Sequence, residues 1–228
     1  QANLIRSHAC GVGEPMEPEH VLLMMVYRAN SLAKGVSGAR PELVELMLGM
    51  LKHGIAPVVP RIGSLGASGD LAPLSHMTLG MMGEGECMQR TDSGWVSSSS
   101  AEALSRAGLT PVVLLAKEGL SLINGTSQMC AYLTVSVLNL EMLIMAADAC
   151  VACSVEAISG SHSPFDPRIH SNRPQYGQSI SAARISGMLQ DSMILHSHAD
   201  CGRVQDAYCF RCSPQVHGPV IDLLAGTR

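Results

Sequence analysis

Apolar residues recur every three to four positions along most of the chain, a spacing that places them on one face of an α-helix. Val21, Met25 and Leu32 follow Pro18 at this spacing, and proline suits the first turn of a helix. The pattern predicts helices over 18–35, 41–54, 70–82, 100–107, 117–123 and 178–189, with a further helix after Pro214. The residues therefore predict a mainly helical fold.

The longest apolar stretch begins at Thr126 or Ser127, either of which can cap a helix, and continues to about Ile158. A helix of about 30 residues is roughly 45–50 Å long, which is typical of elongated bundles. Glu141 and Asp148 interrupt the stretch, and a charge at bilayer depth costs about 2.5–3.5 kcal/mol. We therefore expect the core of a soluble bundle and no membrane association.

Residues 85–98 form the one strand pair that the pattern predicts, a small hairpin around a Ser-Gly turn. Pro57 and Pro60 bracket an extended link before it. We expect an elongated helical bundle with this hairpin, divided into a region over 1–110 and a long-helix region over 111–228.

The composition is unusually apolar for a soluble monomer, with 46% apolar and 15% charged residues and a mean hydropathy of +0.21. Such a chain either buries much of its surface against other subunits or belongs to something larger. We expect both, with Gln1 and Arg228 as internal positions of a longer protein. The net charge of −4 argues against a nucleic-acid partner, which would need clustered Lys and Arg.

The eight cysteines include Cys150-x-x-Cys153 and Cys209-x-x-Cys212, the spacing of a four-thiolate zinc site. The first pair lies in an apolar helical run and neither has a Gly-rich knuckle, so we predict no metal. Buried, reduced thiols in a cytosolic protein are the simpler interpretation. The N-terminus has no basic segment followed by an apolar core, and we expect a cytoplasmic protein.

Residues 63–76 contain a run of very small residues, Ala67-Ser68-Gly69, followed by Asp70 at the start of a predicted helix. A glycine-rich loop before a helix suggests a phosphate site. The loop lacks the Gly-Lys-Ser/Thr ending of a P-loop, and no βαβ pattern surrounds it. A plain tight turn or a backbone-derived reactive group remain as interpretations.

With its flanks, this stretch resembles the signature of the aromatic amino acid ammonia-lyases. The resemblance implies that Ala67-Ser68-Gly69 cyclises and dehydrates to a methylidene-imidazolone (MIO), an electrophile that needs no external cofactor. Cyclisation brings the amide nitrogen of Gly69 to the carbonyl carbon of Ala67, which requires a sharply bent backbone with minimal side chains. Asp70 is implied as a group that supports the MIO.

Two further motifs are similar to those of the same family. Asn124-Gly125-Thr126 resembles the second motif, and the resemblance implies that Asn124 lies near the prosthetic group and the substrate carboxylate. A helix-capping turn residue is the alternative for Asn124. Gln205-Asp206-Ala207-Tyr208-x-x-Arg211 resembles the third motif.

The third motif implies three roles. Gln205 supports the MIO, Tyr208 lines the catalytic site, and Arg211 binds the substrate carboxylate through its planar, two-pronged guanidinium. By spacing alone, Tyr208 would be a packing residue and Arg211 an ordinary salt-bridge partner.

Ser7-His8 occupies the position where members of this family differ by substrate, and it resembles the members that act on histidine. A His8 ring nitrogen can hydrogen-bond an imidazole substrate. The resemblance thus implies L-histidine as substrate, with loss of ammonia to give trans-urocanate.

The family resemblance further implies a homotetramer whose active sites combine residues of three subunits. The family's catalytic base, a tyrosine, is expected before Gln1, and a substrate-contacting Glu after Arg228. We therefore expect residues 1–228 alone to be inactive. The alternatives are a phenylalanine or tyrosine ammonia-lyase, an aminomutase, or a non-catalytic helical scaffold that keeps the loop as a turn.

Overall fold

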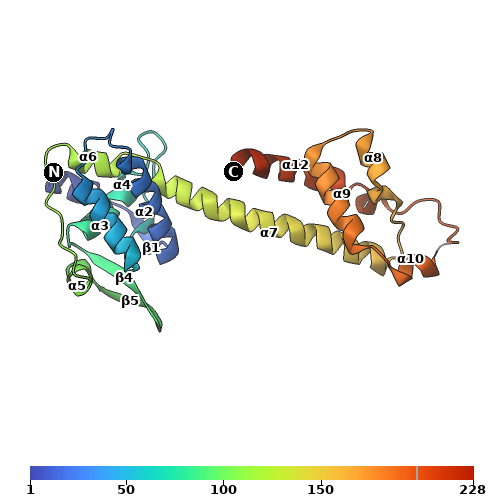
Figure 1. Ribbon diagram of the computed structural model, residues 1–228, viewed down its shortest axis with the longest axis horizontal. Helices are drawn as coiled ribbons and strands as arrows, with labels where there is room; N and C mark the ends of the chain where they lie inside the picture. The colour runs from blue at the N-terminus through green and yellow to red at the C-terminus, as the bar shows by residue number, and fades with distance from the viewer. Residues whose placement is uncertain (199) are drawn as a thin grey trace. The chain divides into compact units, whose positions relative to one another are not determined.

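The computed structural model describes residues 1–198 and 200–228 and is mainly α-helical, as predicted (Figure 1). By internal contacts the chain separates into two compact units, Gln1–Val135 and Ser136–Arg228, here called unit 1 and unit 2. The division lies within a long helix, later than the expected boundary near residue 110. Each unit is described by itself.

The helices of unit 1 follow the predicted apolar pattern, and most begin and end within two residues of the expected positions. Residues 1–13 precede the first helix that the apolar pattern predicts, yet they begin with a helix of their own. The helices are α1 (Ala2–His8), α2 (Pro18–Ala33), α3 (Pro41–Lys52), α4 (Leu71–Met81), α5 (Ser100–Arg106) and α6 (Glu118–Ile123), followed by the start of α7 (Ser127–Ala157).

Five short strands form two antiparallel sheets in unit 1. The predicted hairpin is confirmed as β4 (Glu86–Thr91) and β5 (Gly94–Ser99). The expectation of a single strand pair is wrong. The strand β2 (Ile55–Pro57) pairs with β4, and β1 (Val12–Pro15) pairs with β3 (Pro60–Ile62). Strands of three or four residues are too short to show an alternating pattern.

Methionine fills much of the core of unit 1. Six methionines are fully buried between α2, α3 and α4 and their neighbours: Met24, Met25, Met47, Met50, Met77 and Met81. The unbranched thioether adapts to irregular gaps, which suits a core with few aromatic rings. Figure 1 shows α2 and α3 side by side in this unit.

Unit 2 consists of the rest of α7 and the elements that follow it. These are η1 (Ser163–Phe165), α8 (Pro167–Ser171), α9 (Tyr176–Met188), α10 (Met193–Ser197), α11 (Tyr208–Arg211) and α12 (Ser213–Thr227). Helices α9 and α12 pack against each other. The mostly polar segment 191–202 shows no helical period and predicts a loop, yet it contains α10; its residue 199 lies outside the described residues.

Helix α7 extends over 31 residues, as its apolar pattern predicted. By length and composition alone, the segment 118–157 contains one helix able to cross a membrane. Its Asp148 is fully buried and accepts hydrogen bonds from Ser181 on α9 (2.6 Å) and His217 on α12 (2.8 Å). This carboxylate joins three helices of unit 2.

The cysteines depart from the expectation of buried thiols. Among the described residues all eight are free thiols, and only Cys87 is buried. Five are exposed, including Cys150 and Cys153 of α7.

Candidate active site

The Ala67-Ser68-Gly69 loop is a tight turn between β3 and α4. Leu65 and Gly69 form an isolated antiparallel bridge across it, and the amide of Ser68 lies 3.4 Å from the carbonyl oxygen of Leu65. Ala67 and Ser68 are exposed, whereas Gly69 is buried. Ala67 and Ser68 are therefore accessible to solvent, while the buried Gly69 anchors the turn.

Gly69 must be glycine at this position. Its φ of +83° lies in the left-handed region, which side chains disfavour, and an added Cβ would collide with the carbonyl oxygen of Gly125. The next amide, that of Asp70, donates to the same oxygen at 2.7 Å. The Ala67-Ser68-Gly69 turn therefore contacts the Asn124-Gly125-Thr126 motif directly through the Gly125 carbonyl.

Asp70 is fully buried and connects the loop to α7. Its Oδ2 accepts hydrogen bonds from the amides of Gln128 (2.7 Å) and Met129 (3.1 Å), and its Oδ1 from Ser64 (2.6 Å). Orphan amides and the helix dipole at an N-terminus both favour a carboxylate. The side chain that caps α7 is therefore Asp70, rather than Thr126 or Ser127 as expected.

Asn124 follows the last residue of α6, next to Gly125. Its backbone amide bonds to the carbonyl of Leu120 at 3.0 Å, but its side chain is exposed and makes no hydrogen bond within the described residues. Helix capping therefore does not account for the side-chain amide, which is available to a ligand beside the loop.

His8 ends α1 with its ring orientation fixed locally. Its Nδ1 lies 2.9 Å from the carbonyl oxygen of Leu4 and 3.0 Å from Ser7 Oγ. A carbonyl can only accept, so the bond to Leu4 assigns the proton to Nδ1. In the neutral ring Nε2 is then an acceptor, suited to an N–H donor. Beyond His8, the amide of Gly11 donates to Nε2 of His76 on α4 at 3.1 Å.

Unit 2 brings together the three predicted residues of the third motif. Gln205, Tyr208 and Arg211 line one cavity of about 440 Å³. Tyr208 is 71% exposed, and the guanidinium of Arg211 stacks over its ring at 5.6 Å. Arg211 Nε donates to the carbonyl of Asp206 (2.9 Å), which leaves the outer nitrogens for an anion.

Asp206 fixes the segment that carries this group. Its carboxylate accepts from the amide of Ser161 (2.6 Å) and from Arg203 (3.1 Å), and the hydrogen bond from Ser161 is the main reason that its pKa is lowered. No motif assigns a role to Asp206 or to Arg28, which is buried within the apolar stripe of α2. A charged residue inside such a stripe was the available signal for Arg28.

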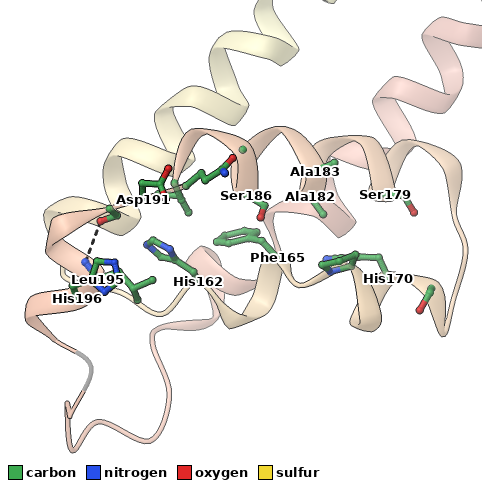
Figure 2. Close-up of a pocket in the computed structure, with 16 residues that line it drawn as sticks. His162, Phe165, His170, Ser179, Ala182, Ala183, Ser186, Asp191, Leu195 and His196 are labelled. Carbon is green, nitrogen blue, oxygen red and sulfur yellow. Dashed lines mark hydrogen bonds between the residues drawn. The ribbon is translucent and has the colours of Figure 1, made fainter.

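A second cavity of unit 2 contains none of the predicted site residues. It measures about 810 Å³ and lies under α9, with Phe165 between His162 and His170 (Figure 2). His162 bonds to Glu156, and His170 to Gln178 and the carbonyl of Pro164. Within the described residues no group of three or more His, Cys, Asp or Glu is arranged to hold a metal ion.

Known proteins of one family match this chain over its full length. The family model described as aromatic amino acid lyase matches residues 1–228. Histidine ammonia-lyase of Stigmatella aurantiaca is 48% identical over 228 residues, which are all of this chain and 44% of that protein. The chain therefore spans less than half the length of such relatives.

Solved structures show the same helical fold. Histidine ammonia-lyase from Trypanosoma cruzi matches 97% of this chain and 40% of its own, with a TM-score of 0.82 and 39% identity. Phenylalanine ammonia-lyase from Rhodosporidium toruloides matches 99% of this chain and 36% of its own, with a TM-score of 0.88 and 31% identity. The family model matches all 228 residues, and the motifs and the fold agree with it. The chain therefore belongs to the aromatic amino acid lyase family.

Proposed function

We propose that the protein containing this chain is a histidine ammonia-lyase, which eliminates ammonia from L-histidine to give trans-urocanate. The observation that carries the proposal is the Ala67-Ser68-Gly69 turn, held at Gly69 against the Gly125 carbonyl. The 48% identity to proteins of that name and the Ser7-His8 pair favour histidine over other substrates.

The residues of the turn fit the MIO group that we propose they form. Gly69 has the backbone freedom that ring closure requires, and a side chain there would meet Gly125. Ala67 and Ser68 are exposed, so the group would be accessible to a substrate. When formed, it supplies an electrophilic methylidene carbon for the amine of the substrate.

The other site residues of the chain bind and orient the substrate in this proposal. Arg211 and Asn124 hold the carboxylate, which fixes the direction of the β-hydrogen relative to the leaving amine. Tyr208 holds the guanidinium of Arg211 by stacking, and Gln205 lines the same cavity and supports the MIO. Nε2 of His8 accepts from the imidazole N–H of histidine.

Two measurements on the full-length protein test the function. The protein is incubated separately with histidine, phenylalanine and tyrosine, and product formation is followed by absorbance. We expect urocanate from histidine as the dominant product. Intact mass should fall short of the encoded mass by two water molecules. An unmodified mass without lyase activity would instead favour the non-catalytic scaffold.

A phenylalanine or tyrosine ammonia-lyase or an aminomutase is the second candidate. The likeness to the Rhodosporidium toruloides phenylalanine ammonia-lyase favours it, although at 31% identity against 48% for the histidine enzymes. Cinnamate or coumarate as the dominant product would establish the lyase, and a β-amino acid the aminomutase.

We also propose a cytoplasmic homotetramer with composite active sites, independent of membranes and nucleic acids. The support is the apolar surface of α7, whose side chains Leu133, Met142 and Leu143 are more than half exposed, together with the net charge of −4. Contacts with other subunits would bury these side chains.

A further inference from the structure

Arg28 is a buried cation in unit 1, and no carboxylate of the described residues pairs with it. The residue is only 5% exposed, and no ion pair includes it among the described residues. Its Nη2 donates to the carbonyl of Ser121, and its Nε has no partner in the described part of the chain. Burial lowers the pKa of the guanidinium from its ordinary value, yet arginine stays charged at neutral pH.

A buried charge without compensation is strongly unfavourable, so its position needs a physical reason. The carbonyl that Arg28 binds, that of Ser121, is one of the last four of α6, and the negative end of a helix dipole stabilises a cation. The other end of α6 is held separately, because Arg40 pairs with Glu118 at 2.6 Å. The two arginines thus fix the two ends of one short helix.

The guanidinium also contacts the turn beneath the candidate active site. An added Cβ on Gly125 would collide with Nη1 of Arg28, and one on Gly69 would collide with the carbonyl oxygen of Gly125. Arg28, Gly125 and Gly69 are therefore stacked in direct contact. On the far side of this stack, Ala67 and Ser68 are exposed.

We propose that Arg28 is a positioning residue for ring closure at Ala67-Ser68-Gly69, because it holds the Gly125 carbonyl against Gly69 and the amide of Asp70. The inference rests on the proposed function. Without the guanidinium, the 121–125 segment loses its support, and Gly69 loses the surface that keeps it in the left-handed conformation.

Ring closure needs no reactant beyond the chain. The nitrogen of Gly69 bonds to the carbonyl carbon of Ala67, whose oxygen leaves as water with the amide hydrogens of Ser68 and Gly69. The Ser68 hydroxyl leaves with the Ser68 α-hydrogen as a second water. Two waters are lost with no net oxidation, so intact mass reports the step independently of lyase activity.

The test uses full-length protein made in a short pulse of cell-free synthesis, with intact mass followed over time. The variants are Arg28→Met, Arg28→Lys and, as a matched control, Arg106→Met, because the side-chain hydrogen bonds of Arg106 within the described residues go to Gln89 and Ser98 of the hairpin. We expect two-water loss about tenfold slower or more in Arg28→Met, intermediate in Arg28→Lys, and unchanged in Arg106→Met.

A second variant tests whether Arg28 acts through Gly125. Gly125→Ala should slow two-water loss, because its methyl group would displace the guanidinium. Combining it with Arg28→Met should add little, since both disturb the same contact. Circular dichroism checks folding, and if Arg28→Met does not fold, the Lys variant decides.

The outcomes separate the two proposals. Complete two-water loss at the wild-type rate in folded Arg28→Met, or in Arg28→Lys where the Met variant does not fold, overturns the role of Arg28 and leaves the proposed function intact. Additive effects of the two substitutions overturn the route through Gly125. A wild-type protein that retains its encoded mass overturns the proposed function, and the role of Arg28 with it.

Discussion

At the scale of single residues, Asp70 determines how the loop and α7 are joined. Its carboxylate accepts three hydrogen bonds, two from the first turn of α7 and one from Ser64. Asp70→Ala should lower the free energy of unfolding by about 2–4 kcal/mol, because buried amides lose their acceptor. Asp70→Asn should cost about 1–2 kcal/mol, because one oxygen and the geometry remain.

Chemical denaturation of the full-length variants measures these losses. Ser64→Ala is the control, because it removes one of the three bonds and leaves the cap of α7 intact. We also expect slower two-water loss in Asp70→Ala than in Asp70→Asn. Equal stability of wild type and Asp70→Ala would contradict the capping role.

His8 is the residue at which substrate choice can be tested. Its Nδ1 is engaged by Leu4, so only Nε2 is free to accept from an imidazole N–H. His8→Leu removes this acceptor and should lower kcat/KM for histidine by about 10- to 100-fold, with a smaller effect on phenylalanine. Steady-state kinetics on both substrates check it. An equal loss on both substrates would mean that His8 does not discriminate.

At the scale of elements, His76 links the segment after α1 to helix α4. The amide of Gly11 donates to its Nε2, so the ring must be unprotonated there, and burial lowers the pKa of His76. A lowered folded-state pKa gives a stabilisation that is complete above the unfolded value of about 6.5 and is lost as pH falls through the folded value.

We expect the free energy of unfolding to fall by about 1–2 kcal/mol between pH 7.5 and pH 5 because His76 becomes protonated. His76→Gln keeps an acceptor for Gly11 but does not titrate. The difference between the two proteins in thermal unfolding across this pH range isolates His76 from the other histidines. Parallel pH profiles would show that His76 contributes nothing.

The elements that could be predicted are those with enough residues to show a period. Helix α7 and the β4–β5 hairpin were both recognisable from their own residues. The strands β2 and β3 have three residues each, and the residues of α1 show no run of apolar positions at helical spacing. Their existence depends on partners elsewhere in unit 1. The capping of α7 by Asp70 likewise depends on tertiary structure, because Asp70 precedes the amide of Gln128 by 58 positions and no local sequence pattern connects the two.

The residues of the candidate site could be predicted from the sequence, but the groups that hold them in place could not. The family motifs pointed to Ala67-Ser68-Gly69, Asn124 and Arg211 directly. The supporting groups behind them, Arg28 and Asp206, were not recognised, because their partners Ser121 and Ser161 lie far along the chain. Structure was needed to show which peptide Gly69 rests on.

At the scale of the whole molecule, the proposal of composite active sites makes a prediction that single-chain catalysis does not. Ser68 lies in unit 1 and Arg211 in unit 2. If one site takes these residues from different subunits, two inactive variants can restore each other. Full-length Ser68→Ala and Arg211→Met are each expected to be inactive on histidine.

Co-expression of the two variants in equal amounts should restore activity. For random assembly, a site receives an intact Ser68 and an intact Arg211 with a probability of about one quarter, so about a quarter of wild-type activity is expected. If both residues come from the same chain, every site carries one defect and no activity returns. Mixing the separately assembled variants is the control, because stable tetramers do not exchange subunits readily. The quarter recovery therefore reports on how the sites are assembled, and its absence would mean that each chain supplies Ser68 and Arg211 together.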